Sequence, residues 1–166
     1  MPETPEEYRE RLANYIEGKD ALILQREAPR TLARLIEGIP EERLRRHPAP
    51  KKWSVVEILA HLAEDELSSS WRYRQMIEHN GEKLLGFDQD EWARLGDYSS
   101  WTASDALEMF RLLREANLRM LSRLSPEEWA RTGVHAERGK LNVRELANHM
   151  AAHDINHIKQ IERLLA

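Results

Sequence analysis

Apolar residues recur every three or four positions along most of this chain, the spacing of one face of an α-helix. The pattern predicts helices over residues 6–18, 20–36, 54–80, 104–124 and 142–165. Pro29 falls inside the second of these and removes a backbone donor, so we expect a kink or a new helix start near it. Residues 1–19 are expected to form a peripheral N-terminal segment, and the four longer helices to pack as a bundle.

Two of the predicted helices begin with the same capping signal. Ser54 is followed three positions later by Glu57, and Asn142 is followed by Glu145. In such a pair, each side chain accepts a hydrogen bond from the backbone N–H of the other residue, which would otherwise lack a partner. We therefore expect helices to start directly after Ser54 and Asn142. The Ser-Pro pair at residues 125–126 predicts one further short helical turn.

The composition favours helix over strand. The chain has 166 residues and only four valines, while leucine, alanine, glutamate and arginine recur throughout. The stretch 81–103 between two predicted helices holds Trp92, Tyr98 and Trp101, which indicates a packed crossover. We therefore predict a single all-α domain over residues 1–166: a four-helix bundle with a long crossover connection and an extra short N-terminal helix.

Charge and hydropathy exclude several classes of function. The net charge is −4 and there is no long basic run, which argues against nucleic acid as a partner. The absence of cysteine excludes disulfides and thiolate ligands. No segment approaches the roughly 20 apolar residues of a membrane span, and the first residues lack a signal-peptide pattern. We expect a cytoplasmic protein without a membrane partner that acts on a small-molecule substrate.

Histidines provide the main candidate chemistry. His149, His153 and His157 follow one another at four-residue spacing, so neighbouring pairs share one face of the last predicted helix. His61 lies in another predicted helix. One of the two pairs, together with His61, would supply three nitrogen ligands and leave an open coordination position, as in catalytic metal sites. The spacing leaves open which pair is used, and it also allows a solvated histidine-rich face.

Three other residues could assist such a site. Asp65, one turn after His61, could be a fourth ligand or orient an imidazole, or it could be a solvated carboxylate in an acidic run. Gln160 could hydrogen-bond a ligand or satisfy a buried polar gap. His135 could carry protons, or it could lie exposed in a loop. Because imidazole binds metal only when neutral, we expect metal affinity to fall below about pH 6.5.

Two stretches of the chain resemble the DinB-like superfamily, a group of DNA-damage-inducible helical bundles. The first is PAPKKWSVVEILAHLA at residues 48–63, and the second is HDINHIKQ at residues 153–160. The resemblance extends over about residues 20–166. It implies a four-helix bundle that holds one divalent metal ion, often nickel or zinc, with manganese and iron as alternatives.

The resemblance also implies which histidines bind the ion. In this family, one ligand comes from the second helix of the bundle and two from the last. Carried over by position, the ligands are His61, His153 and His157. The family pattern does not require His149. This residue would then lie one turn before the pair, where it could contact the ligands or serve as an additional ligand.

For function, the resemblance implies a metal-dependent enzyme of the thiol S-transferase type, in which the metal holds the thiolate of a low-molecular-weight thiol. Two alternatives stay open: a hydrolase that uses metal-bound hydroxide, and a non-catalytic metal-binding protein of the stress response. In both enzymes the nucleophile would be a metal-bound water or thiolate, so no catalytic side chain is assigned. The resemblance further implies a homodimer.

Overall fold

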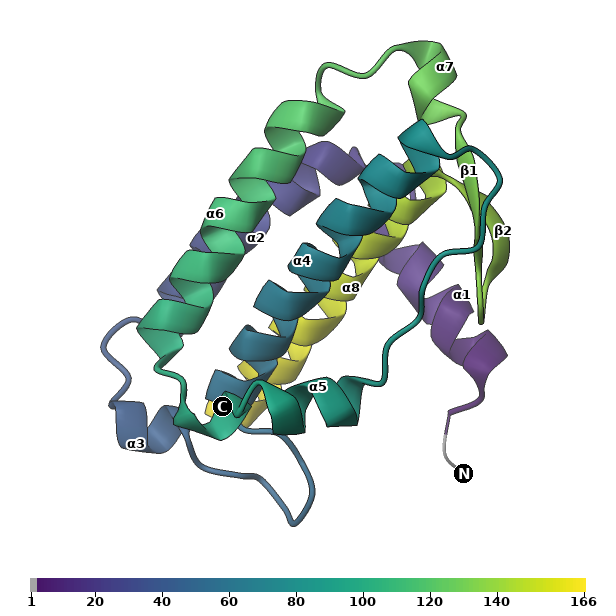
Figure 1. Cartoon of the computed structure of the whole chain (residues 1–166). Helices are drawn as coiled ribbons and strands as arrows, with labels where there is room; N and C mark the ends of the chain where they lie inside the picture. The colour runs from purple at the N-terminus through teal and green to yellow at the C-terminus, as the bar shows by residue number, and fades with distance from the viewer. Residues whose placement is uncertain (1–2) are drawn as a thin grey trace.

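The computed structural model of the chain describes residues 3–166. Its elements, in chain order, are α1 (Pro5–Ile16), α2 (Ala21–Ile36), α3 (Glu41–Leu44), α4 (Val55–Glu78), α5 (Gln89–Leu95), the 3-10 turn η1 (Tyr98–Ser100), α6 (Ala103–Leu121), α7 (Pro126–Trp129), β1 (Thr132–His135), β2 (Gly139–Asn142) and α8 (Val143–Leu165). The long helices α2, α4, α6 and α8 lie along one another, with the shorter elements around them (Figure 1). Within the described residues, no helix has the length and apolar character to cross a membrane.

The four long helices close into a ring. Helix α4 packs against α6 and α8, and α2 packs against the same two helices. Because α4 and α6 run in the same direction, the crossover between them returns along the outside of the bundle (Figure 1). The short helix α1 lies against α8 outside the ring, where Arg11 Nη1 donates to Asn156 Oδ1 at 2.6 Å. The predicted four-helix bundle with a long crossover and an extra N-terminal helix is confirmed.

The helix starts agree with the capping signals in the sequence. The side chains of Ser54 and Asn142 accept hydrogen bonds from the backbone of Glu57 and Glu145, and both glutamates accept from the capping residue in return. Ser125 makes the same reciprocal contact at the start of α7. These local hydrogen bonds set where the two histidine-bearing helices, α4 and α8, begin.

Helix α2 differs from the prediction at Pro29. The helix continues unbroken from Ala21 to Ile36, so no new start occurs there. Proline cannot donate to the carbonyl four residues earlier, which is that of Gln25. Instead, Arg114 Nη1 donates to this oxygen at 3.0 Å. A side chain of α6 thus replaces the missing backbone hydrogen bond of α2.

The crossover between α4 and α6 holds more structure than the sequence indicated. It contains the seven-residue helix α5, capped by the side chain of Asp88. The turn η1 buries Tyr98, whose hydroxyl donates to Glu64 Oε2 at 2.6 Å. Trp101 Nε1 donates to the carbonyl of Gly96 at 2.8 Å. The aromatic residues therefore pack this crossover onto the bundle, as predicted.

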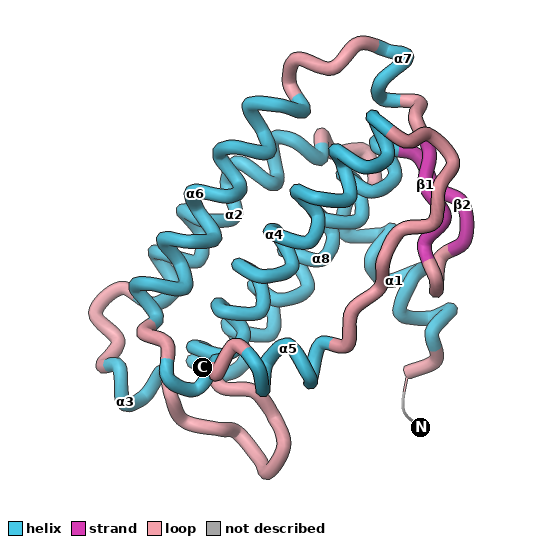
Figure 2. The backbone as a smooth tube through the Cα atoms, in the orientation of Figure 1, coloured by secondary structure: helices cyan, strands magenta, loops and turns pink. Residues whose placement is uncertain are grey.

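A β-hairpin precedes α8, in a segment where the all-α prediction included no strand. Strands β1 and β2 pair antiparallel, with Thr132 opposite Asn142 (Figure 2). Position 133 in β1 requires glycine, because a Cβ there would lie only 2.7 Å from Leu84 Cδ2. Each strand has only four residues, too few to show an alternating pattern in the sequence.

A buried polar layer separates two apolar clusters in the core. One cluster includes Leu59 and Phe110, and the other includes Tyr73 and Leu146. The layer between them is formed by buried polar residues of all four long helices: Gln25, Glu66, Arg114, Asn117 and Asp154. The candidate metal ligands lie next to this layer, because His153 directly precedes Asp154 in α8.

Candidate metal centre

Three histidine side chains from α4 and α8 converge on one point. His61 Nε2 lies 3.3 Å from His153 Nε2, which lies 3.1 Å from His157 Nε2. The candidate ligand atoms of all three lie within 4.8 Å of one another. Helix α8 presents His153 and His157 one turn apart, and the neighbouring helix α4 supplies His61. Of the two pairs that the spacing allowed, this is the one that meets His61.

Burial keeps these imidazoles neutral. His61 and His153 are buried and His157 is half-buried. Loss of hydration lowers the pKa of His61 to about 3 and that of His157 to about 4. It also lowers the pKa of His153 well below its ordinary value. A neutral imidazole offers a lone pair, and three such nitrogens close together fit a divalent cation.

Gln160 orients the imidazole of His157. His157 Nδ1 lies 2.9 Å from Gln160 Oε1. An amide oxygen only accepts hydrogen bonds, so Nδ1 carries the proton and Nε2 keeps its lone pair. The lone pair is therefore on the nitrogen that faces the other two histidines. Gln160 thus contacts a candidate ligand, one of the two roles that the sequence left open.

Asp65 lies beside the other nitrogen of His153. Asp65 Oδ2 is 3.4 Å from His153 Nδ1, and this buried nitrogen has no hydrogen-bond partner within the described part of the chain. Asp65 is itself buried, and loss of hydration raises its pKa to about 7. Its burial excludes the alternative that Asp65 is a solvated carboxylate. A carboxylate in this place can accept a hydrogen bond from Nδ1–H, which would leave the lone pair of His153 on Nε2, the nitrogen that faces His61 and His157.

His149 and His135 lie outside the nitrogen cluster. The ring centroid of His149 is 5.9 Å from that of His153, one turn away from the cluster. His135 lies on β1, where its Nδ1 accepts a hydrogen bond from the backbone of Glu137 at 3.2 Å. It is half-buried, and this burial lowers its pKa, so it is not an exposed loop histidine.

A buried ion-pair network lies directly behind the site and was not predicted from the sequence. Arg114 donates to Glu66 Oε2 at 2.7 Å and to Asp154 Oδ2 at 2.5 Å. Asn117 Nδ2 donates to Glu66 Oε1 at 2.7 Å. Because Asp154 follows His153 in α8, the network adjoins a candidate ligand through the backbone.

One signal in the sequence could have indicated this network. Arg114 stands four residues after Phe110 and four before Leu118, inside the apolar stripe of α6. A charged residue in such a stripe must be buried with a partner, because an unpaired buried charge is costly. The partner could not be identified from sequence, since Glu66 belongs to an acidic run typical of a solvated face.

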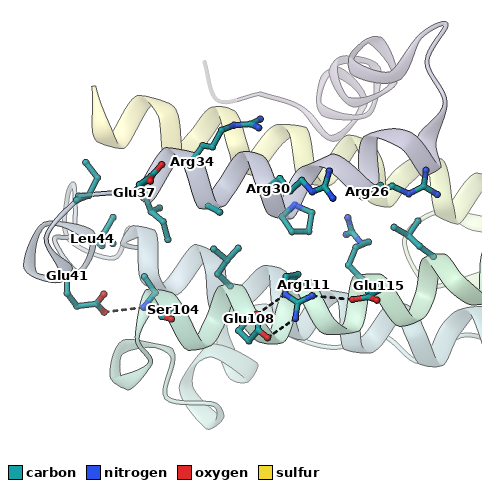
Figure 3. A pocket seen from close by; sticks show the side chains of 18 of the residues that line it. Arg26, Arg30, Arg34, Glu37, Glu41, Leu44, Ser104, Glu108, Arg111 and Glu115 are labelled. Atoms are coloured by element: carbon teal, nitrogen blue, oxygen red, sulfur yellow. Dashed lines mark hydrogen bonds and ion pairs between the residues drawn. The ribbon is translucent and has the colours of Figure 1, made fainter.

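A large groove lies on the opposite edge of the ring, between α2 and α6. It has a volume of about 1100 Å³. Arg30 and Arg34 line one wall, and Arg111, paired with Glu108 and Glu115, lines the other (Figure 3). None of its lining residues is a histidine. The candidate chemistry is therefore at the histidine cluster between α4 and α8 and not in this groove.

Comparison with known proteins identifies the family. The family model described as the DinB superfamily matches residues 24–161, which include the whole histidine cluster. The chain belongs to the DinB superfamily. The resemblance drawn from the two sequence stretches is therefore confirmed.

Proteins similar to this chain carry a functional name. Two proteins of Oceanobacillus iheyensis named "Putative metal-dependent hydrolase" are 26% and 21% identical to this chain, over 82% and 81% of it and 78% of each relative. YfiT of Bacillus subtilis carries the same name and is 23% identical over 95% of this chain and 91% of its own. The solved YfiT structure, described as having an unusual four-helix bundle topology, matches with a TM-score of 0.81 at 19% identity, covering 87% of this chain and 83% of that one. This likeness shows a shared fold.

Proposed function

We propose that the protein is a metal-dependent enzyme that binds one divalent ion, nickel or zinc, through His61, His153 and His157. The convergence of three neutral imidazole nitrogens within 4.8 Å carries this proposal. Imidazole nitrogen suits nickel, zinc and iron, whereas magnesium and calcium prefer oxygen ligands. Three protein ligands also leave a coordination position for a reactant, which is the arrangement of catalytic sites.

The reaction that we propose is transfer of a low-molecular-weight thiol to an electrophile. When bound, the ion would supply Lewis-acid activation of the thiol, which metals hold as the thiolate near neutral pH. The chain contains no cysteine, so the sulfur nucleophile has to be a separate molecule. Gln160 orients the imidazole of His157, Asp65 Oδ2 lies 3.4 Å from His153 Nδ1, and Trp53, with its ring centroid 5.0 Å from that of His61, packs against the third imidazole.

Hydrolysis is the second candidate, favoured by the names of the relatives in Oceanobacillus iheyensis and Bacillus subtilis. The same three histidines and the same open position would serve it, with water in place of the thiol. The two reactions differ in one measurable way: only the transferase consumes a thiol. A metal-binding protein without catalysis would perform neither.

The experiment that tests the proposal uses untagged protein loaded with zinc or nickel. Displacement of chloride from chlorodinitrobenzene by each of a panel of small thiols is measured beside hydrolysis of nitrophenyl acetate without thiol, and His153→Ala serves as the inactive control. We expect metal-dependent, thiol-dependent turnover by the wild type only. Ester hydrolysis without thiol would contradict the transferase proposal and support the hydrolase. Metal binding without either activity would contradict both reactions.

A further inference from the structure

Helix α8 carries the candidate ligands between two neighbouring helices, α4 and α1. On the α4 side, His153 and His157 meet His61, and the Nε2 atoms of His61 and His153 are 3.3 Å apart. On the α1 side, Asn156 Oδ1 accepts a hydrogen bond from Arg11 Nη1 at 2.6 Å. Residues three and four positions after a helical residue lie on opposite sides of it, so Asn156 and His157 flank His153. The metal centre therefore lies between α4 and α1.

Helix α1 covers its side of α8 with one face. Leu12 is buried, and Tyr8 and Tyr15, at helical spacing from it, are half-buried. Lys159 Nζ of α8 lies 5.5 Å from the centroid of the Tyr15 ring. The main packing partner of α1 is α8, so this helix rests on the ring of four helices from outside (Figure 1).

A small cavity begins one helical turn from the cluster and ends short of it. It has a volume of about 480 Å³, and its lining includes Arg9 of α1 and His149 of α8, together with residues of the hairpin. None of the three candidate ligands lines it. His61 is 1% exposed and His153 is 7% exposed. Solvent thus comes close to the metal centre beside α1 but hardly reaches these two ligands.

Arg11 holds α1 against α8. Besides Asn156, its guanidinium donates to the hydroxyl of Tyr15 at 3.0 Å and to both carboxylate oxygens of Glu3 at 2.7 and 2.8 Å. Within residues 3–166, its contact with Asn156 is the one side-chain hydrogen bond that joins the two helices. Residues 17–20 connect α1 to α2, and Gly18 there has a φ of +69°, a conformation that favours glycine. Few contacts therefore fix the position of α1.

We propose that α1 is a gate over the metal centre, held closed by the contact between Arg11 and Asn156. A peripheral helix with few contacts opens at a lower free energy than the one at which the whole bundle unfolds. Opening would connect the cavity at His149 to the open coordination position. The inference rests on the proposed function, because the gate controls passage to the metal. Arg11 then sets how fast ions and reactants exchange, and not how tightly the three histidines bind.

The first test measures access to the cluster without a metal. Because the chain contains no cysteine, His153→Cys places a single thiol in the cluster. Ser69→Cys places one inside the bundle instead, where Ser69 is buried against Met150. Each is combined with Arg11→Met, and the reaction of the thiol with dithionitrobenzoate is timed. We expect Arg11→Met to speed this reaction at position 153 by at least about tenfold, because opening no longer breaks the hydrogen bond, and at position 69 by less than about twofold.

Two outcomes of this test would overturn the gate. An unchanged rate at position 153 would show that Arg11 does not hold the cluster closed. Equal acceleration at positions 153 and 69 would show that Arg11→Met loosens the whole bundle. Arg94→Met, which removes an exposed ion pair with Glu91 in α5, is the matched control and should change neither rate.

The second test uses zinc-loaded protein with all three histidines in place. Arg11→Met should raise the rates of zinc uptake and of zinc release to a chelator by the same factor of at least about ten, with the dissociation constant changed less than about threefold, because a gate alters the barrier and not the bound state. Unchanged rates, or faster release with weaker binding, would contradict the gate. If the wild type binds no zinc, the proposed function fails, whereas the thiol experiment still decides whether α1 closes the cluster.

Discussion

The guanidinium of Arg114 in α6 lies 2.5 Å from the carboxylate of Asp154, the residue that directly follows the candidate ligand His153 in α8. The same guanidinium also reaches Glu66 in α4 and the carbonyl of Gln25 in α2. One side chain thus links all four long helices at the level of the metal centre. It holds the two histidine-bearing helices in a defined register.

The first prediction concerns this link. Arg114→Met leaves Glu66 and Asp154 buried without their cation, so we expect the free energy of unfolding to fall by about 3–5 kcal/mol. Arg111→Met, on the exposed face of the same helix, removes only surface ion pairs and should cost less than about 1 kcal/mol. Urea denaturation of both variants measures the difference. A loss for Arg114→Met as small as that for Arg111→Met would show that the network does not stabilise the fold.

The second prediction distinguishes the two histidine pairs. His157→Ala removes a nitrogen that lies 3.1 Å from that of His153, so zinc affinity should fall by more than about a hundredfold, beyond the effect of losing a residue that only contacts a ligand. His149→Ala should retain one equivalent of zinc, because its ring lies outside the cluster. Metal analysis and chelator competition on untagged protein give both values. The reverse result would assign the site to His149 and His153.

The third prediction is the dependence of metal binding on pH. Because burial lowers the pKa of His61 to about 3 and that of His157 to about 4, both stay neutral well below the pH of about 6.5 expected from the sequence. Protons should therefore compete with zinc only as the pH approaches these lower values. We expect the zinc dissociation constant to change by less than about threefold between about pH 7.5 and about pH 6. A rise of more than about tenfold in chelator competition, with the fold intact by circular dichroism, would indicate ordinary imidazole pKa values.

The fourth prediction is the homodimer that the family resemblance implied. The groove between α2 and α6 offers Arg30 and Arg34 on one wall and Glu108 and Glu115 on the other, so two copies related by a two-fold axis could pair them. Arg30→Glu should then weaken dimerisation by at least about tenfold, whereas Arg123→Glu, outside the groove, should not. Sedimentation equilibrium measures both. A wild-type monomer at every concentration would refute the prediction, and a dimer unaffected by Arg30→Glu would place the interface elsewhere.

Much of the fold could be predicted because its signals are local. The caps at Ser54 and Asn142 need only residues three positions away, and the apolar stripes need only one helix at a time. The sequence did not predict the hairpin before α8, because its strands are short. The hairpin also packs against the crossover, as at Gly133 and Leu84, and such a contact is not visible in the sequence. The unbroken course of α2 through Pro29 was missed because its compensating donor comes from another helix.

The sequence by itself determined that His153 and His157 share one face of a helix, since a four-residue interval is close to one helical turn. It did not determine that His61 would face them, nor that Asp65 and Glu66 would be buried. Those outcomes depend on how α4 and α8 are rotated about their axes. That rotation is set by contacts between residues far apart in the chain, such as His61 and His153, which are 92 positions apart, and only the packed bundle brings them together.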